Sequence, residues 1–113
     1  EFLHVDDLGD ACVFALERWS ALAANAPRDA LGEALAFLNV GTGEDFSIKK
    51  YAQIVKKIIN PKAKIKFNSK FPDGTPRKLL DIKNLNYLGW SHKTKLKKGI
   101  ELTYIWAKNK KEI

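Results

Sequence analysis

A ten-residue segment containing two prolines and a glycine, residues 71–80, constrains the fold more than any other part of the chain. Its sequence is Phe-Pro-Asp-Gly-Thr-Pro-Arg-Lys-Leu-Leu, and we call it the proline loop. Pro72 and Pro76 fix their own φ angles and push the residues before them toward extended conformations. The Asp-Gly pair between the prolines is a strong turn signal. The segment is therefore predicted to be a stiffened loop that holds its polar groups at fixed separations.

Three charged side chains lie in the proline loop, namely Asp73, Arg77 and Lys78. The Asp73 carboxylate can accept two hydrogen bonds from sugar hydroxyls or from the N–H edge of a base. Lys78 can place a point charge on a diphosphate, and Arg77 can bind a phosphate in a bidentate manner. Loops of this composition are also common as plain surface turns, so the residues alone leave both interpretations open.

The length of the chain predicts one domain, residues 1–113, with one modest core. Hydrophobic residues make up 45% of the sequence, which is enough to fold. Cys12 is the single cysteine, so no disulfide can form within the chain. Neither an apolar run of about 18 residues nor a signal-peptide pattern is present, and we therefore expect a soluble, cytoplasmic protein without a membrane partner.

Charge is unevenly distributed between the two parts of the chain. Residues 1–45 contain two basic and nine acidic side chains, whereas residues 46–113 contain 18 basic and four acidic ones. A basic half suggests an anionic partner, such as a nucleic acid or a phosphorylated ligand. However, 17 of those 18 cations are lysines, and most aromatic residues occupy positions predicted to be buried. Nucleic-acid surfaces usually add arginines and exposed aromatics, so a solvated lysine-rich surface is favoured over a nucleic-acid-binding module.

The pattern of apolar residues predicts alternating short helices and strands, and hence an α/β chain. Helices are expected over residues 6–22, 48–59, 82–87 and 95–108, and strands over residues 2–5, 35–40 and 63–67. The tail, residues 109–113, is expected to fray.

Two helix starts have recognisable caps. Asp6 is predicted to cap the first helix, with further acidic residues placed favourably for the helix dipole. Ser47 is predicted to cap the second. Cys12 lies on the apolar stripe of the first helix, so its thiol is expected to be buried and inert.

A glycine-containing turn, residues 41–43, follows a predicted strand and precedes a helix, which invites a dinucleotide-binding interpretation. The fuller fingerprint fails, because its third glycine would fall at Phe46 and no acid lies about 20 residues later to hold a ribose. A tight structural turn is favoured, although its free amides could still border a cleft.

Other chemical signals are weak. His4 lies beside two aspartates, but the only other histidine, His92, is distant in sequence, so no metal site is predicted. Tyr104 and Lys108 have the spacing of a Tyr-x-x-x-Lys pair, but on a terminal helix without a partner serine, which we attribute to chance. The chain is thus predicted to contain no catalytic, cofactor-binding or metal-binding residue.

Four segments, in chain order, resemble the C-terminal part of GDP-L-fucose synthase, an extended short-chain dehydrogenase/reductase of nucleotide sugars. They are Glu-Phe-Leu-His-Val-Asp-Asp (residues 1–7), Asn-Val-Gly-Thr-Gly (39–43), the proline loop, and Leu-Gly-Trp (88–90). The likeness covers nearly the whole chain, except about residues 21–36. The opening segment recurs across many sugar-nucleotide epimerases and dehydratases, whereas the proline loop is much more specific to the fucose synthase branch.

The resemblance implies a small mixed α/β substrate-binding part whose Rossmann domain is absent from this chain. In the family, the N-terminal Rossmann domain binds NADPH and carries a Ser/Tyr/Lys centre with a Cys/His acid–base pair. The whole enzyme, a homodimer, epimerises GDP-4-keto-6-deoxy-D-mannose and reduces it to GDP-L-fucose. The abrupt start in a predicted strand also suggests a fragment, which alone would be inactive and would partner its own Rossmann domain.

The resemblance carries GDP-sugar binding onto Asp73 and Lys78, and onto Arg77 if its side chain does not point outward. An arginine that the family uses just before Glu1 is not in this sequence. The alternatives are part of another sugar-nucleotide epimerase or dehydratase, and the basic nucleic-acid-binding module considered above.

Overall fold

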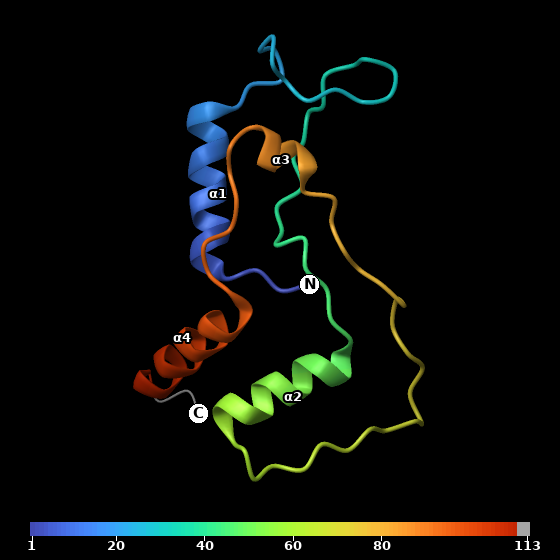
Figure 1. The fold of residues 1–113 in the computed structure, drawn as a ribbon, viewed down its shortest axis with the longest axis vertical. Coiled ribbons are helices and arrows are strands. Elements are labelled where there is room, and N and C mark those ends of the chain that lie inside the picture. The colour runs from blue at the N-terminus through green and yellow to red at the C-terminus, as the bar shows by residue number, and fades with distance from the viewer. Residues whose placement is uncertain (111–113) are drawn as a thin grey trace.

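Residues 1–110 are described by the computed structural model, and they form four helices joined by long extended segments (Figure 1). The helices are α1 (Val5–Arg18), α2 (Ile48–Ile59), α3 (Lys83–Tyr87) and α4 (Leu96–Asn109). The molecule is thin, with extents of 54 × 35 × 18 Å. Because one helix with its side chains is about 10–12 Å wide, this thickness allows at most two layers of structure.

Helix α1 begins earlier and ends sooner than predicted. His4 is the N-cap residue, and its ring Nδ1 accepts a hydrogen bond from the Asp6 amide at 3.3 Å. The prediction that Asp6 caps the helix was therefore wrong, and Asp6 instead lies in the first turn with Asp7, where the helix dipole favours an acid. The helix stops at Arg18 because Trp19 turns to an extended conformation (φ −119°, ψ 139°).

The other helices lie close to their predicted positions. Ser47 caps α2 as predicted, and its hydroxyl accepts a hydrogen bond from the Lys50 amide at 3.2 Å. After α3 the chain reverses at Gly89, whose φ of +103° lies in the left-handed region that favours glycine. Helix α4 includes Asn109, so the predicted fraying does not begin there, and residues 111–113 of the predicted tail lie outside the described residues.

The predicted strands do not form a sheet. Within residues 1–110 the only β-type pairing is one isolated antiparallel bridge between Arg28 and Ala34. The segments predicted as strands (2–5, 35–40 and 63–67) have no neighbouring strand in this part of the chain to pair with their backbone N–H and C=O groups. The mixed α/β prediction is corrected to a small, mainly helical arrangement with extended connections.

The core is small and joins α1 to α3. Its fully packed members are Ala11, Leu85 and Trp90, which are 1%, 1% and 5% exposed. Leu3, Phe14, Leu38 and Val40 pack against this cluster while staying partly exposed. A second contact places the Tyr51 ring of α2 edge-on to Phe2 and Phe46, with ring centroids 4.6 and 5.7 Å apart.

Many apolar side chains remain uncovered. Cys12 is exposed rather than buried, and the prediction that most aromatic residues are buried also fails at several positions, because Phe2, Phe37, Phe46, Phe67, Phe71, Tyr87 and Trp106 are exposed. These predictions failed because an apolar stripe is covered only where a second layer lies against it, and a slab this thin supplies few such places. No helix within residues 1–110 combines the length and apolar character needed to cross a bilayer.

Candidate functional site

The proline loop is an exposed connection without helix or strand, and it follows the edge of the molecule opposite α4 (Figure 1). Asp73 and Lys78 are exposed, and neither forms an ion pair with another residue of the described chain. Arg77 has 72% of its side chain exposed and lies beside an acid, with its Nε 3.7 Å from Asp45 Oδ2. The three predicted site residues therefore share one exposed loop, but only Arg77 is paired within the chain.

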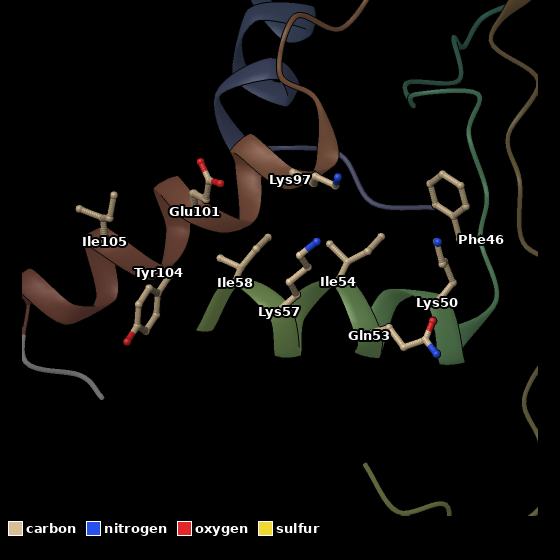
Figure 2. A pocket seen from close by; sticks show the side chains of 10 residues that line it. All are labelled: Phe46, Lys50, Gln53, Ile54, Lys57, Ile58, Lys97, Glu101, Tyr104 and Ile105. Carbon is tan, nitrogen blue, oxygen red and sulfur yellow. The ribbon is translucent and has the colours of Figure 1, made fainter. Parts of the chain in front are cut away.

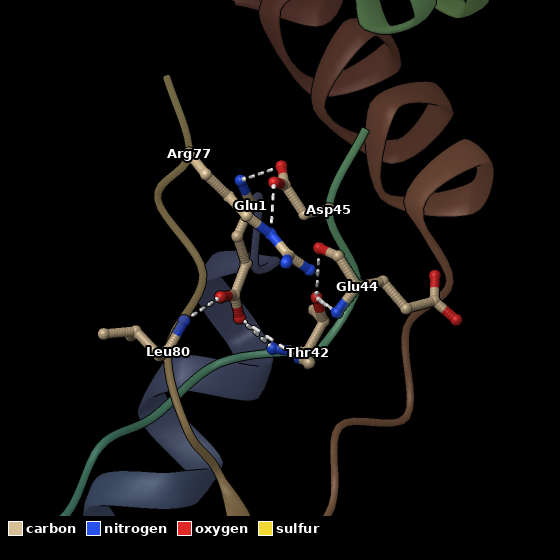
Figure 3. A network of polar contacts seen from close by, with 7 residues as sticks. Glu1, Thr42, Glu44, Asp45, Arg77 and Leu80 are labelled. Atoms are coloured by element: carbon tan, nitrogen blue, oxygen red, sulfur yellow. Dashed lines mark hydrogen bonds and ion pairs between the residues drawn. The ribbon is translucent and has the colours of Figure 1, made fainter. Parts of the chain in front are cut away.

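A carboxylate buried at the base of the loop connects three segments (Figure 3). Glu1 Oε1 accepts hydrogen bonds from the amides of Thr42 and of Gly43, the latter at 3.2 Å. Glu1 Oε2 accepts a hydrogen bond from the Leu80 amide at 2.9 Å. We call these residues, together with Asp45 and Arg77, the Glu1 network.

The environment of Glu1 favours its charged form. Burial raises the pKa of the Glu1 carboxyl, but the amides of Leu80, Thr42 and Gly43 lower it, and the net pKa lies below its ordinary value of 4.5. The carboxylate thus occupies the turn amides that a nucleotide phosphate would need. This supports the structural interpretation of the 41–43 turn over a dinucleotide-binding one.

Sequence reasoning missed Glu1 and Asp45 as contributors to this region. The Asp45 carboxylate accepts a hydrogen bond from the main-chain nitrogen of Glu1 at 3.4 Å and forms an ion pair with Arg77. Asp45 therefore joins Glu1 to the proline loop. No spacing rule could have found these contacts, because they join residues 44 and 79 positions apart (Glu1 with Asp45 and with Leu80). The one available signal was an acid next to a glycine turn, which is too common to be specific.

A second acidic contact fixes the start of α4 against α1. The buried Asp7 carboxylate accepts hydrogen bonds from the amides of Lys93 at 3.3 Å and Thr94 at 2.9 Å. Burial raises the pKa of Asp7, but these amide donors outweigh it and leave the pKa below its ordinary value of 3.8. One turn later, Asp10 accepts a hydrogen bond from the Trp90 indole at 2.8 Å and pairs with Lys93 Nζ at 3.1 Å. We call this set the α1 junction.

A cleft with a volume of about 730 Å³ lies elsewhere, between α2 and α4 (Figure 2). Ile54 and Ile58 point from α2 toward α4, and Tyr104 projects from the side of α4 that faces α2, whereas Ile105 points away from α2. None of Asp73, Arg77 and Lys78 lines this cleft. Its size alone does not make it the site, because it contains none of the residues that carry the family resemblance.

Metal chemistry finds no support in the described residues. Within residues 1–110 there is no group of three or more His, Cys, Asp or Glu side chains that could hold a metal ion. His4 instead has its ring Nδ1 3.7 Å from Asp6 Oδ2 and serves as a helix cap.

Comparison with known proteins identifies relatives of the whole chain, although no protein-family model matches it. The chain is 42% identical to GDP-L-fucose synthase 1 of Arabidopsis thaliana over 106 residues, which are 94% of this chain and 29% of that protein. It is also 42% identical to the GDP-L-fucose synthase of Escherichia coli (strain K12), over 94% of this chain and 32% of that protein. This chain is homologous to part of GDP-L-fucose synthase. The resemblance inferred from the four sequence segments is thereby confirmed.

Solved structures agree with the sequence relatives. A GDP-6-OMe-4-keto-L-xylo-heptose reductase from C. jejuni superposes with a TM-score of 0.84 at 35% identity, covering 97% of this chain and 31% of the reductase. MlghC, a GDP-mannoheptose C4 reductase from Campylobacter jejuni with NADP bound, gives a TM-score of 0.73 at 33% identity over 96% of this chain and 31% of that one. The matching region is the C-terminal part of these GDP-sugar reductases. The chain therefore spans about 30% of the length of its relatives.

Proposed function

We propose that this chain is the GDP-sugar-binding part of a GDP-L-fucose synthase, with Asp73 and Lys78 as the residues that contact the substrate. One observation carries the proposal, namely 42% identity over 94% of the chain to proteins of that name. The exposure of Asp73 and Lys78 supports it, since a side chain that meets a ligand must be accessible.

The two side chains suit different parts of a GDP-sugar. The Lys78 ammonium meets the diphosphate, where a compact cation stabilises negative charge. The Asp73 carboxylate accepts hydrogen bonds from sugar hydroxyls or from the base. Arg77 contributes less to ligand binding, because its guanidinium already lies beside Asp45.

The whole enzyme would epimerise GDP-4-keto-6-deoxy-D-mannose at two carbons and then reduce its 4-keto group with NADPH, as a cytoplasmic homodimer. The hydride site and the acid–base groups would come from an N-terminal Rossmann domain. This chain would supply binding energy from the remote GDP group, which orients the sugar for reaction. A second candidate is an enzyme acting on another GDP-sugar, which the names of the two heptose reductases favour.

A chimeric enzyme tests the proposal. The matched segment of the E. coli GDP-L-fucose synthase is replaced by this chain, and NADPH oxidation is followed with GDP-4-keto-6-deoxy-D-mannose. We expect the chimera to be active, and the 113-residue chain alone to be inactive. A chimera that melts cooperatively and binds NADPH, yet turns over neither this substrate nor a GDP-heptose, would overturn the proposal.

Variants of the chimera test the two residues. Lys78→Ala and Asp73→Ala each remove a charge-assisted hydrogen bond worth about 1.5–3 kcal/mol, which corresponds to a roughly ten- to hundredfold rise in the KM of the GDP-sugar. The KM of NADPH is expected to stay unchanged. Lys83→Ala is the matched control, because Lys83 is also an exposed lysine but lies in α3 and pairs with Asp81. Equal effects of the Lys78 and Lys83 substitutions would mean that the proline loop is a plain surface turn without a binding role.

A further inference from the structure

The proline loop is tied down on both sides of Lys78. Before it, Arg77 Nε lies 3.7 Å from Asp45 Oδ2. After it, the Leu80 amide donates a hydrogen bond to Glu1 Oε2 at 2.9 Å. One residue further on, the Asp81 carbonyl accepts a hydrogen bond from Asn39 Nδ2 at 3.2 Å.

The first part of the loop has no such attachment. Residues 71–76 are exposed, and within the described chain they make no ion pair or side-chain hydrogen bond to another segment. Asp73 lies in this free part, whereas Lys78 lies in the anchored part. The two proposed ligand contacts therefore differ in how firmly the chain holds them before a ligand arrives.

We propose that Glu1 is a positioning residue for GDP-sugar binding, whose carboxylate fixes the backbone beside Lys78 by joining Leu80 to the 41–43 turn. Asp45 assists by holding Arg77 on the other side of Lys78. The inference rests on the proposed function, because it assigns a preorganised diphosphate contact to Lys78. Holding the backbone in place lowers the entropy cost of ordering a long lysine side chain on a ligand.

An ionised carboxylate suits this bridge better than other side chains. Glu1 uses one oxygen for Thr42 and Gly43 and the other for Leu80, so both oxygens must be acceptors. Glutamine would turn an NH₂ group toward one of these amides, and a donor cannot bond a donor. The side chain is only 8% exposed, so water cannot readily replace the lost acceptor.

Gly41 makes room for the carboxylate. A Cβ atom built at Gly41 would overlap Glu1 Oε1 and would lie 2.9 Å from Glu1 Cδ. Gly41→Ala therefore provides a second way to displace Glu1 without changing its charge.

The titratable groups around the Glu1 carboxylate are Asp45, Arg77 and the Tyr51 hydroxyl on α2. The pKa of Tyr51 is raised, mainly because of burial.

Two measurements on Glu1→Gln test the proposal. In the ¹⁵N-labelled 113-residue chain, we expect the Leu80 amide to exchange at least about tenfold faster than in the unsubstituted chain, while amides of α2 keep their rates. In the unsubstituted chain, the protection of the Leu80 amide against exchange should decrease as the pH falls through the lowered pKa of Glu1. Glu1→Gln should lose that pH dependence. Gly41→Ala should also speed exchange at Leu80.

In the chimera, Glu1→Gln should raise the KM of the GDP-sugar about three- to tenfold and leave kcat and the KM of NADPH unchanged. The double variant with Lys78→Ala should bind no worse than Lys78→Ala alone, because Glu1 acts through Lys78. Glu44→Gln is the control, since Glu44 is an exposed neighbouring acid whose side chain takes no part in the Glu1 network.

The outcomes separate the two proposals. Unchanged Leu80 exchange in Glu1→Gln, or additive losses in the double variant, would overturn the positioning role of Glu1 and leave the proposed function standing. An inactive but folded chimera would overturn the proposed function, and the binding role of Glu1 with it.

Discussion

The α1 junction and the proline loop are both held by carboxylates that accept backbone N–H bonds, but only the junction is backed by packed apolar side chains. Asp7 is 4% exposed and lies on the helix that contributes Ala11 to the core with Leu85 and Trp90. The carboxylate of Glu1 is also buried, yet Arg77 and Leu80, the two anchored loop residues that flank Lys78, are exposed. The junction should therefore control whether the chain folds, whereas the Glu1 network should control where one loop lies.

The largest expected effect comes from the core behind the junction. Leu85→Ala removes a side chain that is 1% exposed, and we expect a loss of about 2–5 kcal/mol in the free energy of unfolding. Chemical denaturation followed by circular dichroism measures it. Leu22→Ala is the control, because Leu22 is 97% exposed and its loss should change stability by less than about 0.5 kcal/mol. Similar losses for both variants would mean that the small cluster is not the core.

A smaller loss in the free energy of unfolding is expected when the Asp7 carboxylate of the α1 junction is replaced. Asp7→Asn removes the charge that accepts the amides of Lys93 and Thr94, and we expect it to cost about 1–3 kcal/mol. Asp6→Asn is the matched control, since the Asp6 side chain is 84% exposed one residue earlier. A comparable Tm for the two variants would mean that the Asp7 carboxylate does not stabilise the α1 junction.

The smallest expected effect is the change of Tm with pH. Because the pKa of Asp7 is lowered on folding, its contribution to stability is fully present above the unfolded pKa and is lost as the pH falls through the folded pKa. We expect the Tm to be nearly constant from about pH 7 to about pH 5 and to fall below that range, less steeply in Asp7→Asn. Glu1→Gln should change this Tm profile little while altering Leu80 exchange. Matching Tm profiles for Asp7→Asn and the unsubstituted chain would exclude Asp7 as a source of acid sensitivity.

The helices could be predicted because their signals are local. The Ser47 cap and the chain reversal at Gly89 each depend on residues within a few positions, and the structure places α2 and α3 where these signals do. The strands could not be predicted correctly in the same way, since a strand is completed by a partner that the apolar pattern of residues 35–40 does not specify. The exposure of Cys12 has the same cause, because an apolar stripe does not say whether anything covers it.

In the candidate site, too, the local features could be predicted from the sequence and the long-range contacts could not. Two prolines and an Asp-Gly pair predicted an exposed loop, and the loop is exposed. The partners of Arg77 and Leu80 could not be predicted, because they lie 32 and 79 positions away in sequence, at Asp45 and Glu1. Roles for Asp73 and Lys78 came from resemblance and stay predictions.

The space left by Gly41 links two distant positions in any future variation of this sequence. A chain that acquired a side chain at position 41 would already have pushed the Glu1 carboxylate away from Thr42 and Leu80. We then expect substitution of Glu1 to be nearly neutral, whereas in the present background we expect it to free the Leu80 amide. The order in which the two changes occur would therefore matter, and a glycine outside the proline loop would help to decide which residues position 1 can tolerate.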